Sequence, residues 1–161
     1  ILAYQVMLRA ADPRLYSQVE SQSSTTGAPS SSGGIPFPIP FPIPFGSGVV
    51  GGSVNVANAG NAPGHPRIQI VGPITSPAVT NTTTGEAIYL DGLVVTSAQT
   101  LVIETRPPRY VTVSGVNAAG SIRWADSTYP SLAPGGNVIQ FTGGGTSGAT
   151  TMTVFWRDSY L

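Results

Sequence analysis

The chain of 161 residues contains no cysteine and no lysine, and His65 is its single histidine. The absence of cysteine excludes disulfides and metal sites built on thiolates. With no lysine or cysteine and one histidine, the chain is poor in the side chains that act as a general base or a nucleophile near neutral pH. These absences argue against an enzyme, and they predict that no cofactor or metal is needed.

Charge is also scarce. Seven arginines balance seven acidic residues, and 9% of residues are charged, whereas ordinary soluble domains carry about a quarter. Without clustered basic residues, the chain is not expected to bind nucleic acid. No apolar run approaches the roughly 20 residues of a membrane span, so membrane insertion is not expected either. The low charge fits either a compositional bias of the source genome or a surface that neighbouring subunits largely cover.

Residues 1–16 form the first of three zones. Leu2, Tyr4, Val6 and Leu8 alternate with other residues, which predicts a strand over residues 1–9. Pro13 favours its end, because proline cannot donate to a sheet ladder. A single strand is not stable alone. We therefore expect it either to pair with the later sandwich or to continue from an N-terminal domain that is absent from this chain, which starts at Ile1 and not at Met.

Residues 17–52 are predicted to be a linker arm. Residues 21–34 are rich in Ser, Thr and Gly, the composition of a flexible linker. Prolines then alternate with large apolar residues, a pattern that predicts an extended polyproline II segment of about 34 Å. Because apolar side chains rarely face water on all sides, we expect an interaction arm lying across an apolar surface in preference to a free spacer. Its candidate contact residues are Ile35, Phe37, Ile39, Phe41, Ile43 and Phe45.

Residues 53–161 have the pattern of a β-sandwich. Short segments with apolar residues two apart alternate with Gly, Pro and Asn breakers, at the 8–12-residue spacing of sandwiches and barrels. The fold class is therefore all-β. The predicted strands are residues 54–58, 67–71, 78–81, 86–90, 100–104, 110–114, 121–124, 137–141 and 151–156. The predicted core residues are Ile68, Ile70, Ile88, Leu90, Leu101, Ile103, Val111, Val113, Ile139 and Phe141.

Few residues suggest chemistry. His65 lies between prolines in a loop, and a packing or hydrogen-bonding role is far more common there than catalysis. A sandwich could bring Glu86 near Glu104 as a carboxylate pair for glycoside hydrolysis, but two solvated strand residues are the more ordinary interpretation. Trp124 and Tyr129 are candidates for contact with a sugar or a protein partner. Aromatic residues on strands more often belong to a core or an interface.

Several stretches, in order, resemble the distal tail and minor tail proteins of siphophages, in their C-terminal half. The stretches are residues 11–17, 40–46, 58–74, 81–85, 101–105, 132–137 and the closing aromatic strand up to Tyr160. One departure is Glu104, where members of this family usually carry an Asp.

The resemblance implies a galectin-like jelly-roll β-sandwich in the virion, at the distal end of the phage tail. It implies that the full-length protein forms a ring, usually hexameric, and that this domain docks other tail-tip or receptor-binding proteins. An alternative is a carbohydrate-binding adhesion module that contacts a glycan on the host cell. A hydrolase is a third hypothesis, weakened by the lack of any base other than carboxylates.

Overall fold

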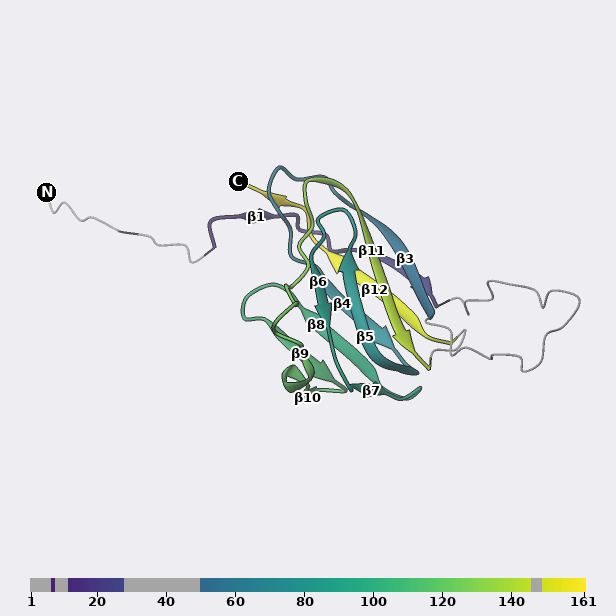
Figure 1. Cartoon of the computed structure of the whole chain (residues 1–161). Helices are drawn as coiled ribbons and strands as arrows, with labels where there is room; N and C mark the ends of the chain where they lie inside the picture. The colour runs from purple at the N-terminus through teal and green to yellow at the C-terminus, as the bar shows by residue number, and fades with distance from the viewer. Residues whose placement is uncertain (1–6, 8–11, 28–49, 146–148) are drawn as a thin grey trace, which may run out of the picture.

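The chain folds as two antiparallel β-sheets packed against each other, shown for the computed structural model in Figure 1. The structure describes residue 7 and residues 12–27, 50–145 and 149–161. Strands such as β4 and β12 alternate buried with partly exposed side chains, so that each sheet turns one face inward. The predicted all-β sandwich is confirmed. In the described part of the chain, no helix is long and apolar enough to cross a membrane.

The first sheet has six strands in the order β10–β9–β8–β4–β12–β2, and each neighbouring pair is antiparallel. Its strands are β2 Ser21–Thr26, β4 Arg67–Val71, β8 Thr100–Glu104, β9 Tyr110–Val113, β10 Val116–Asn117 and β12 Thr151–Trp156. Ser114 and Gly115, between β9 and β10, both have positive φ, as a tight two-residue hairpin turn requires.

The second sheet has the order β3–β11–β5–β6, with β7 paired to β5. Its strands are β3 Val50–Asn58, β5 Ile74–Asn81, β6 Ala87–Tyr89, β7 Val94–Val95 and β11 Gly135–Gly144. Two short strands, β1 Leu15–Tyr16 and β13 Ser159–Tyr160, form a separate ladder at the end of the sandwich where the described chain terminates. The 3-10 helix η1 spans Ala119–Ser121.

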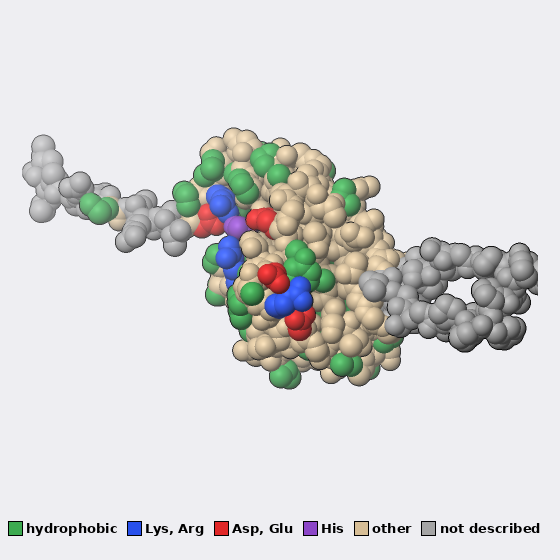
Figure 2. Space-filling view, in the orientation of Figure 1, with side chains coloured by type: hydrophobic (Ala, Val, Ile, Leu, Met, Phe, Trp, Pro, Cys, Tyr) green, Lys and Arg blue, Asp and Glu red, His purple; other side chains and the backbone are tan. Residues whose placement is uncertain are grey.

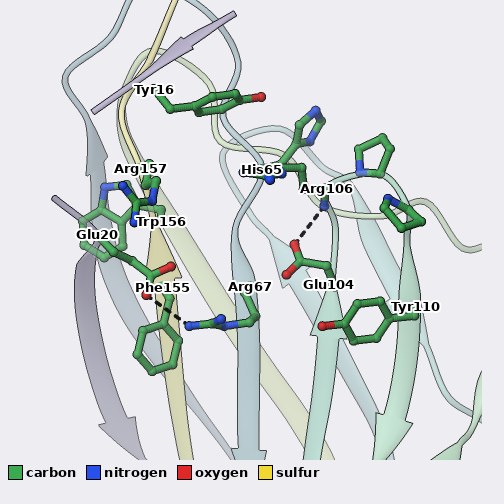
Figure 3. A pocket seen from close by; sticks show the side chains of 12 residues that line it. Tyr16, Glu20, His65, Arg67, Glu104, Arg106, Tyr110, Phe155, Trp156 and Arg157 are labelled. Atoms are coloured by element: carbon green, nitrogen blue, oxygen red, sulfur yellow. Dashed lines mark hydrogen bonds and ion pairs between the residues drawn. The ribbon is translucent and has the colours of Figure 1, made fainter. Parts of the chain in front are cut away.

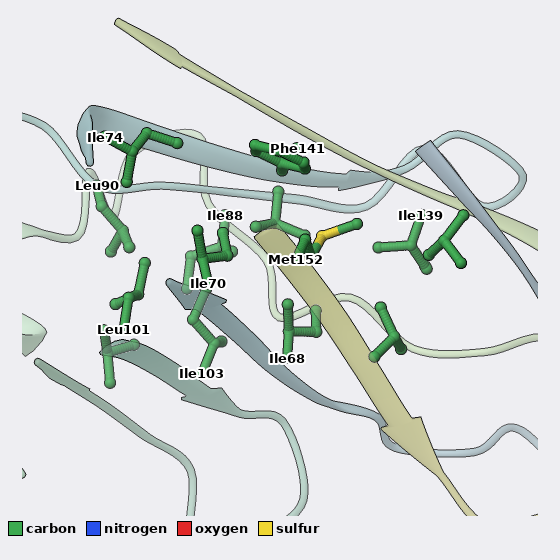
Figure 4. Packing of buried hydrophobic residues seen from close by; sticks show 14 of the residues in the cluster. Ile68, Ile70, Ile74, Ile88, Leu90, Leu101, Ile103, Ile139, Phe141 and Met152 are labelled. Atoms are coloured by element: carbon green, nitrogen blue, oxygen red, sulfur yellow. The ribbon is translucent and has the colours of Figure 1, made fainter. Parts of the chain in front are cut away.

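The core lies between the two sheets, and Figure 4 shows its packing. All ten predicted core residues are buried, which confirms the two-residue period on which the prediction rests. Met152 and Trp156 of β12 and Leu132 before β11 also belong to this core. Because the two inner faces interdigitate, the sandwich holds the outer faces of its sheets in fixed positions.

Residues 121–124 do not form the predicted strand. η1 leads instead to a single bridge between Ile122 and Leu90, and the backbone then turns, with the Asp126 amide donating to the Arg123 carbonyl. Ile122 is buried, but Trp124 is exposed. Ile122 and Trp124 have the two-residue spacing of a half-buried strand, but Ile122 alone of the two faces the core. The spacing therefore gave a wrong prediction here.

The predicted linker over residues 17–52 is wrong at both ends. β2 pairs along its whole length with β12, and β3 already begins at Val50. The sequence of β2, Ser-Gln-Ser-Ser-Thr-Thr, lacks apolar alternation because β2 is an edge strand, with Gln22, Ser24 and Thr26 facing solvent. Backbone pairing holds such a strand without a hydrophobic face.

Some predictions fall on residues that the structure does not describe. The six candidate residues of the arm lie within residues 28–49, outside the described part of the chain. Of the predicted strand over residues 1–9, residue 7 alone is described. The end of that first zone is described, and residues 15–16 form β1.

Candidate functional site

Residues 12–20, called the N-terminal strap below, cross one end of the six-stranded sheet. The middle of the strap is β1, which pairs with β13. Ser17 extends this attachment, because its amide donates to the Asp158 carbonyl at 2.9 Å and its Oγ accepts from the Asp158 amide at 3.1 Å. The strap is therefore joined to the segment that follows β12.

The strap turns its two aliphatic side chains, Leu15 and Val19, outward. Leu15 is 71% exposed and Val19 is 75% exposed. A strand of a sandwich ordinarily points apolar side chains at the core and polar ones at water. Since the strap does the reverse, apolar burial contributes little to its attachment, and hydrogen bonds and charges hold it.

Two arginines of the six-stranded sheet and its margin bind the strap. Arg157, directly after β12, donates from one guanidinium nitrogen to the Ser17 carbonyl at 2.8 Å and to the Gln18 carbonyl. Arg67, the first residue of β4, forms an ion pair with Glu20 at 3.1 Å. These contacts hold the part of the strap that leads into β2.

Two more arginines act at the start of the strap. The Arg14 guanidinium donates to Nε2 of His65 at 2.6 Å. The Arg106 guanidinium, in the β8–β9 loop, lies 5.6 Å from the centre of the Tyr16 ring, a cation–π distance. The Tyr16 hydroxyl in turn donates to Asp12 at 2.6 Å. In Figure 2 the histidine and the charged side chains around it form one compact group on the surface of the sandwich.

A pocket of about 290 Å³ lies beneath the strap. Figure 3 shows Tyr16 on one side of it and Arg67 and Glu104 across from that ring. Its three arginines and two glutamates give it a net charge of +1, with His65 neutral. The lining residues are Tyr16, Glu20, His65, Arg67, Glu104, Arg106, Pro107, Pro108, Tyr110, Phe155, Trp156 and Arg157.

Part of the pocket is a cross-strand row on the outer face of the sheet. Phe155, Arg67, Glu104 and Tyr110 stand opposite one another on β12, β4, β8 and β9. The Arg67 guanidinium lies 4.7 Å from the centre of the Phe155 ring, and its Nε is buried with no hydrogen-bond partner among the described residues. Stacking and the ion pair to Glu20 thus hold this side chain flat against the sheet.

His65 is the titratable group at the centre of these contacts. Burial lowers the pKa of His65 below its usual value near 6.5, and the positive charges of Arg14 and Arg109 lower it further. Asp12 and Glu86 act on it in the opposite direction with a smaller effect. His65 is therefore held neutral, the form that can accept the hydrogen bond from Arg14.

The other acidic candidates have structural partners. Burial raises the pKa of Glu86, but hydrogen bonds from Ser131 and Thr84 outweigh this, so the pKa lies below its usual value. Glu104 accepts from the Arg106 amide and lines the pocket, whereas Glu86 does not line it. Within the described residues, no group of three His, Cys, Asp or Glu side chains could hold a metal ion.

The structure brings Trp124 and Tyr129 together. Their ring centres are 6.4 Å apart and the rings are tilted by 51°. Trp124 is 64% exposed, while Tyr129 packs partly against the core and has the Arg109 guanidinium 5.4 Å from its ring centre. Beside them, Arg123 pairs with two acidic side chains, Asp91 and Asp126. This aromatic patch is thus flanked by charges that are largely paired.

Sequence reasoning missed the strap and its arginines. Arg67, Arg106 and Arg157 lie far apart in the chain, and only the folded sheet brings them to one end. The available signal was the pair of arginines in Arg106-Pro-Pro-Arg109, a concentration of charge in a chain that has little. The outward apolar residues of the strap have no sequence signal that separates them from a buried strand.

Comparison with known proteins identifies the family. The siphovirus-type tail component family, through its C-terminal domain, matches residues 59–160. The crystal structure of the Dit protein of phage SPP1, described as a paradigm of the hub adsorption apparatus in phages that infect Gram-positive bacteria, aligns with a TM-score of 0.54 and 14% sequence identity. The alignment covers 94% of this chain and 50% of SPP1 Dit, so the chain spans half the length of that protein. No curated protein matches the chain.

The structural likeness agrees with the predicted galectin-like jelly-roll sandwich. The family match covers well over half of the chain and includes most strands of both sheets. The chain therefore belongs to the siphovirus-type tail component family, as a structural component of the distal part of the phage tail in the virion.

Proposed function

We propose that this chain is the peripheral domain of a distal tail protein, which works by assembly and docks other tail-tip or receptor-binding proteins without a catalytic step. The observation that carries the proposal is the family match over residues 59–160. The sandwich with fixed outer faces and a charge-poor sequence supports it, because a surface covered by neighbouring subunits needs few charges. We further propose that the full-length protein is a homo-oligomer, with a hexameric ring as in its family.

The arm is the proposed docking element. It belongs to residues 28–49, between edge strand β2 of one sheet and edge strand β3 of the other. In polyproline II, three residues make one turn, so the alternating side chains of the arm point in widely different directions. One surface cannot cover all of them, which favours an arm held between its own domain and a neighbouring tail protein. The six proposed contacts are Ile35, Phe37, Ile39, Phe41, Ile43 and Phe45.

The test is a phage that carries Phe37→Ser, Phe41→Ser and Phe45→Ser together. We expect tails that lack part of the tip by electron microscopy, because the apolar contacts of the arm are lost. The control is a phage with Val94→Ser and Val116→Ser, two exposed apolar residues of the sandwich. Complete, infectious tails in the triple variant would rule out a docking role for the arm.

A second candidate function is recognition of a host glycan, and the exposure of Trp124 beside Tyr129 favours it. An exposed indole can stack on the apolar face of a sugar ring, as it does on other flat partners. A glycan array with the full chain tests this, and we expect Trp124→Ala to abolish any signal while Val94→Ala preserves it. Signals that survive Trp124→Ala would place sugar binding elsewhere, and an empty array would count against this function.

A further inference from the structure

The strap is attached to the sandwich by a single layer of polar contacts. The short β1–β13 ladder and the hydrogen bonds of Ser17 with Asp158 hold its middle. Four arginines add the remaining contacts: Arg14 through His65, Arg106 through Tyr16, Arg67 through Glu20, and Arg157 through backbone carbonyls of the strap. Leu15 and Val19 of the strap face solvent, and Tyr16 is half-buried over the pocket. The core strands, by contrast, are held by buried apolar side chains on both sheets. The strap can therefore detach while the core stays folded, because the two attachments use different forces.

His65 is the member of this layer that changes charge between pH 5 and 8. The contact with Arg14 requires a lone pair on Nε2, so the proton of the neutral ring must be on Nδ1. Once Nε2 is protonated, the ring can no longer accept, and two cations face each other where a hydrogen bond was. A proton on His65 therefore turns an attraction at the start of the strap into a repulsion.

The charges around His65 come from three parts of the fold. Arg14 and Asp12 belong to the strap, Arg109 to the β8–β9 loop, and Glu86 precedes β6. His65 also lines the pocket, whose other charged side chains already have partners. Arg67 pairs with Glu20 of the strap, and Arg157 donates to the Ser17 carbonyl. Glu104 accepts from the Arg106 amide. No carboxylate of the described residues forms an ion pair with His65 that would stabilise a charged ring.

We propose that the N-terminal strap is a pH-sensitive latch, closed when His65 is neutral and accepts from Arg14, and opened when His65 is protonated. Opening releases the start of the strap from the sandwich on acidification, while the two sheets stay intact.

The direction of the pH dependence follows from the lowered pKa of His65. Because the folded, latched state prefers the neutral ring, the free state binds more protons, and the attachment is complete above the usual histidine pKa near 6.5. It is lost as the pH falls below that value. Hydrogen bonds, from the Tyr16 hydroxyl first, lower the pKa of Asp12 below 3.8, so Asp12 stays ionised at pH 5.

Hydrogen exchange of the full chain, read by mass spectrometry on peptides from the strap and from β4, tests the latch at pH 7.5 and pH 5. After correction for the intrinsic pH dependence of exchange, we expect protection of the strap to fall about tenfold or more at pH 5, while β4 stays protected. Equal protection of the strap at both values would overturn the proposal.

Two variants separate His65 from other titrating groups. His65→Gln keeps an acceptor for Arg14 but does not titrate, and Arg14→Gln removes the positive partner. We expect the pH dependence of strap protection to disappear in both, whether the strap is held or released at pH 7.5. If both variants keep the wild-type pH dependence, another group is responsible and the latch is not His65.

Discussion

Gly60 shows how one residue controls the end of the sandwich where the strap is attached. A Cβ built on Gly60 would lie 1.9 Å from the Ser159 carbonyl oxygen, far inside any tolerated contact. Asn58 completes the arrangement, since its side-chain oxygen accepts from the amides of Gly60 and Ser159. The turn after β3 and strand β13 can approach this closely because residue 60 has no side chain.

We expect Gly60→Ala to destabilise the protein by about 1–3 kcal/mol, because backbone must move to admit the methyl group. The matched control is Gly120→Ala, where no atom lies within 4 Å of the added carbon. Urea unfolding of both variants measures the difference. Equal midpoints would mean that the turn and β13 are not packed as described.

A Phe141→Ala variant tests the packing of the core between the two sheets. Phe141 is fully buried on β11, and shortening a buried Phe to Ala typically costs about 3–5 kcal/mol. Val116, 70% exposed on β10, is the control, because Val116→Ala is expected to change stability by less than about 0.5 kcal/mol. Thermal and urea unfolding report both. A small effect at Phe141 would contradict a close-packed interface between the sheets.

At the level of elements, β2 carries the largest departure from the sequence prediction. Ser24 and Thr153 are direct cross-strand partners, and their hydroxyl oxygens lie 2.9 Å apart. Because the chain has no cysteine of its own, a Ser24→Cys, Thr153→Cys double variant has two thiols and no competing one.

In that variant we expect an intramolecular disulfide upon oxidation, and a thermal midpoint higher than that of the same variant after reduction. The stabilisation is expected to be about 2–4 kcal/mol, because the bond closes a long loop of the unfolded chain. Peptide mapping identifies the bond, and the two single variants are controls. Failure to form it would indicate that residues 21–26 behave as the linker that their composition suggested.

The contrast between β2 and the core strands shows what sequence can predict. Apolar residues two apart on β4 and β8 fixed both the strands and the faces they bury, because burial is what the pattern reports. β2 contains no apolar residue, so its pairing left no pattern to detect. The pocket could not be predicted for a similar reason. Its residues are far apart in the sequence and come together only once the sheet has formed.

Trp124 and Tyr129 illustrate the limit for the candidate sites. The sequence named both residues as candidates for contact with a sugar or a protein partner. The structure brings their rings together. Their spacing did not predict that Trp124 would face solvent, since that depends on the turn after Ile122. A contact with a partner remains a proposal for this pair and for the arm.

At the scale of the whole molecule, the sandwich limits pairing at its edges. The outer edge of β6 is met by the segment after η1, where Arg123 donates its amide to the Tyr89 carbonyl and Thr128 donates to Ala87. β2 presents a wholly polar edge. The covered edge of β6 reduces uncontrolled strand addition there.

We expect the whole fold to be independent of metal ions. The chain has one histidine and no cysteine, and its described acidic residues form no metal-binding group. Treatment with EDTA should therefore leave the thermal midpoint of the full chain unchanged. A clear decrease that added calcium or zinc reverses would contradict this expectation.

Thr26 and Gly52 belong to opposite sheets yet lie next to each other, since a Cβ on Gly52 would be 2.8 Å from the Thr26 carbonyl oxygen. The chain therefore departs from β2 and returns to β3 at nearly the same point. For protein engineering, this is a natural grafting site: a foreign peptide spliced in place of residues 28–49 would have its two anchor points already matched by the scaffold. Cargo of varied length could then be displayed from one defined corner of the domain, with no strand shifted in register.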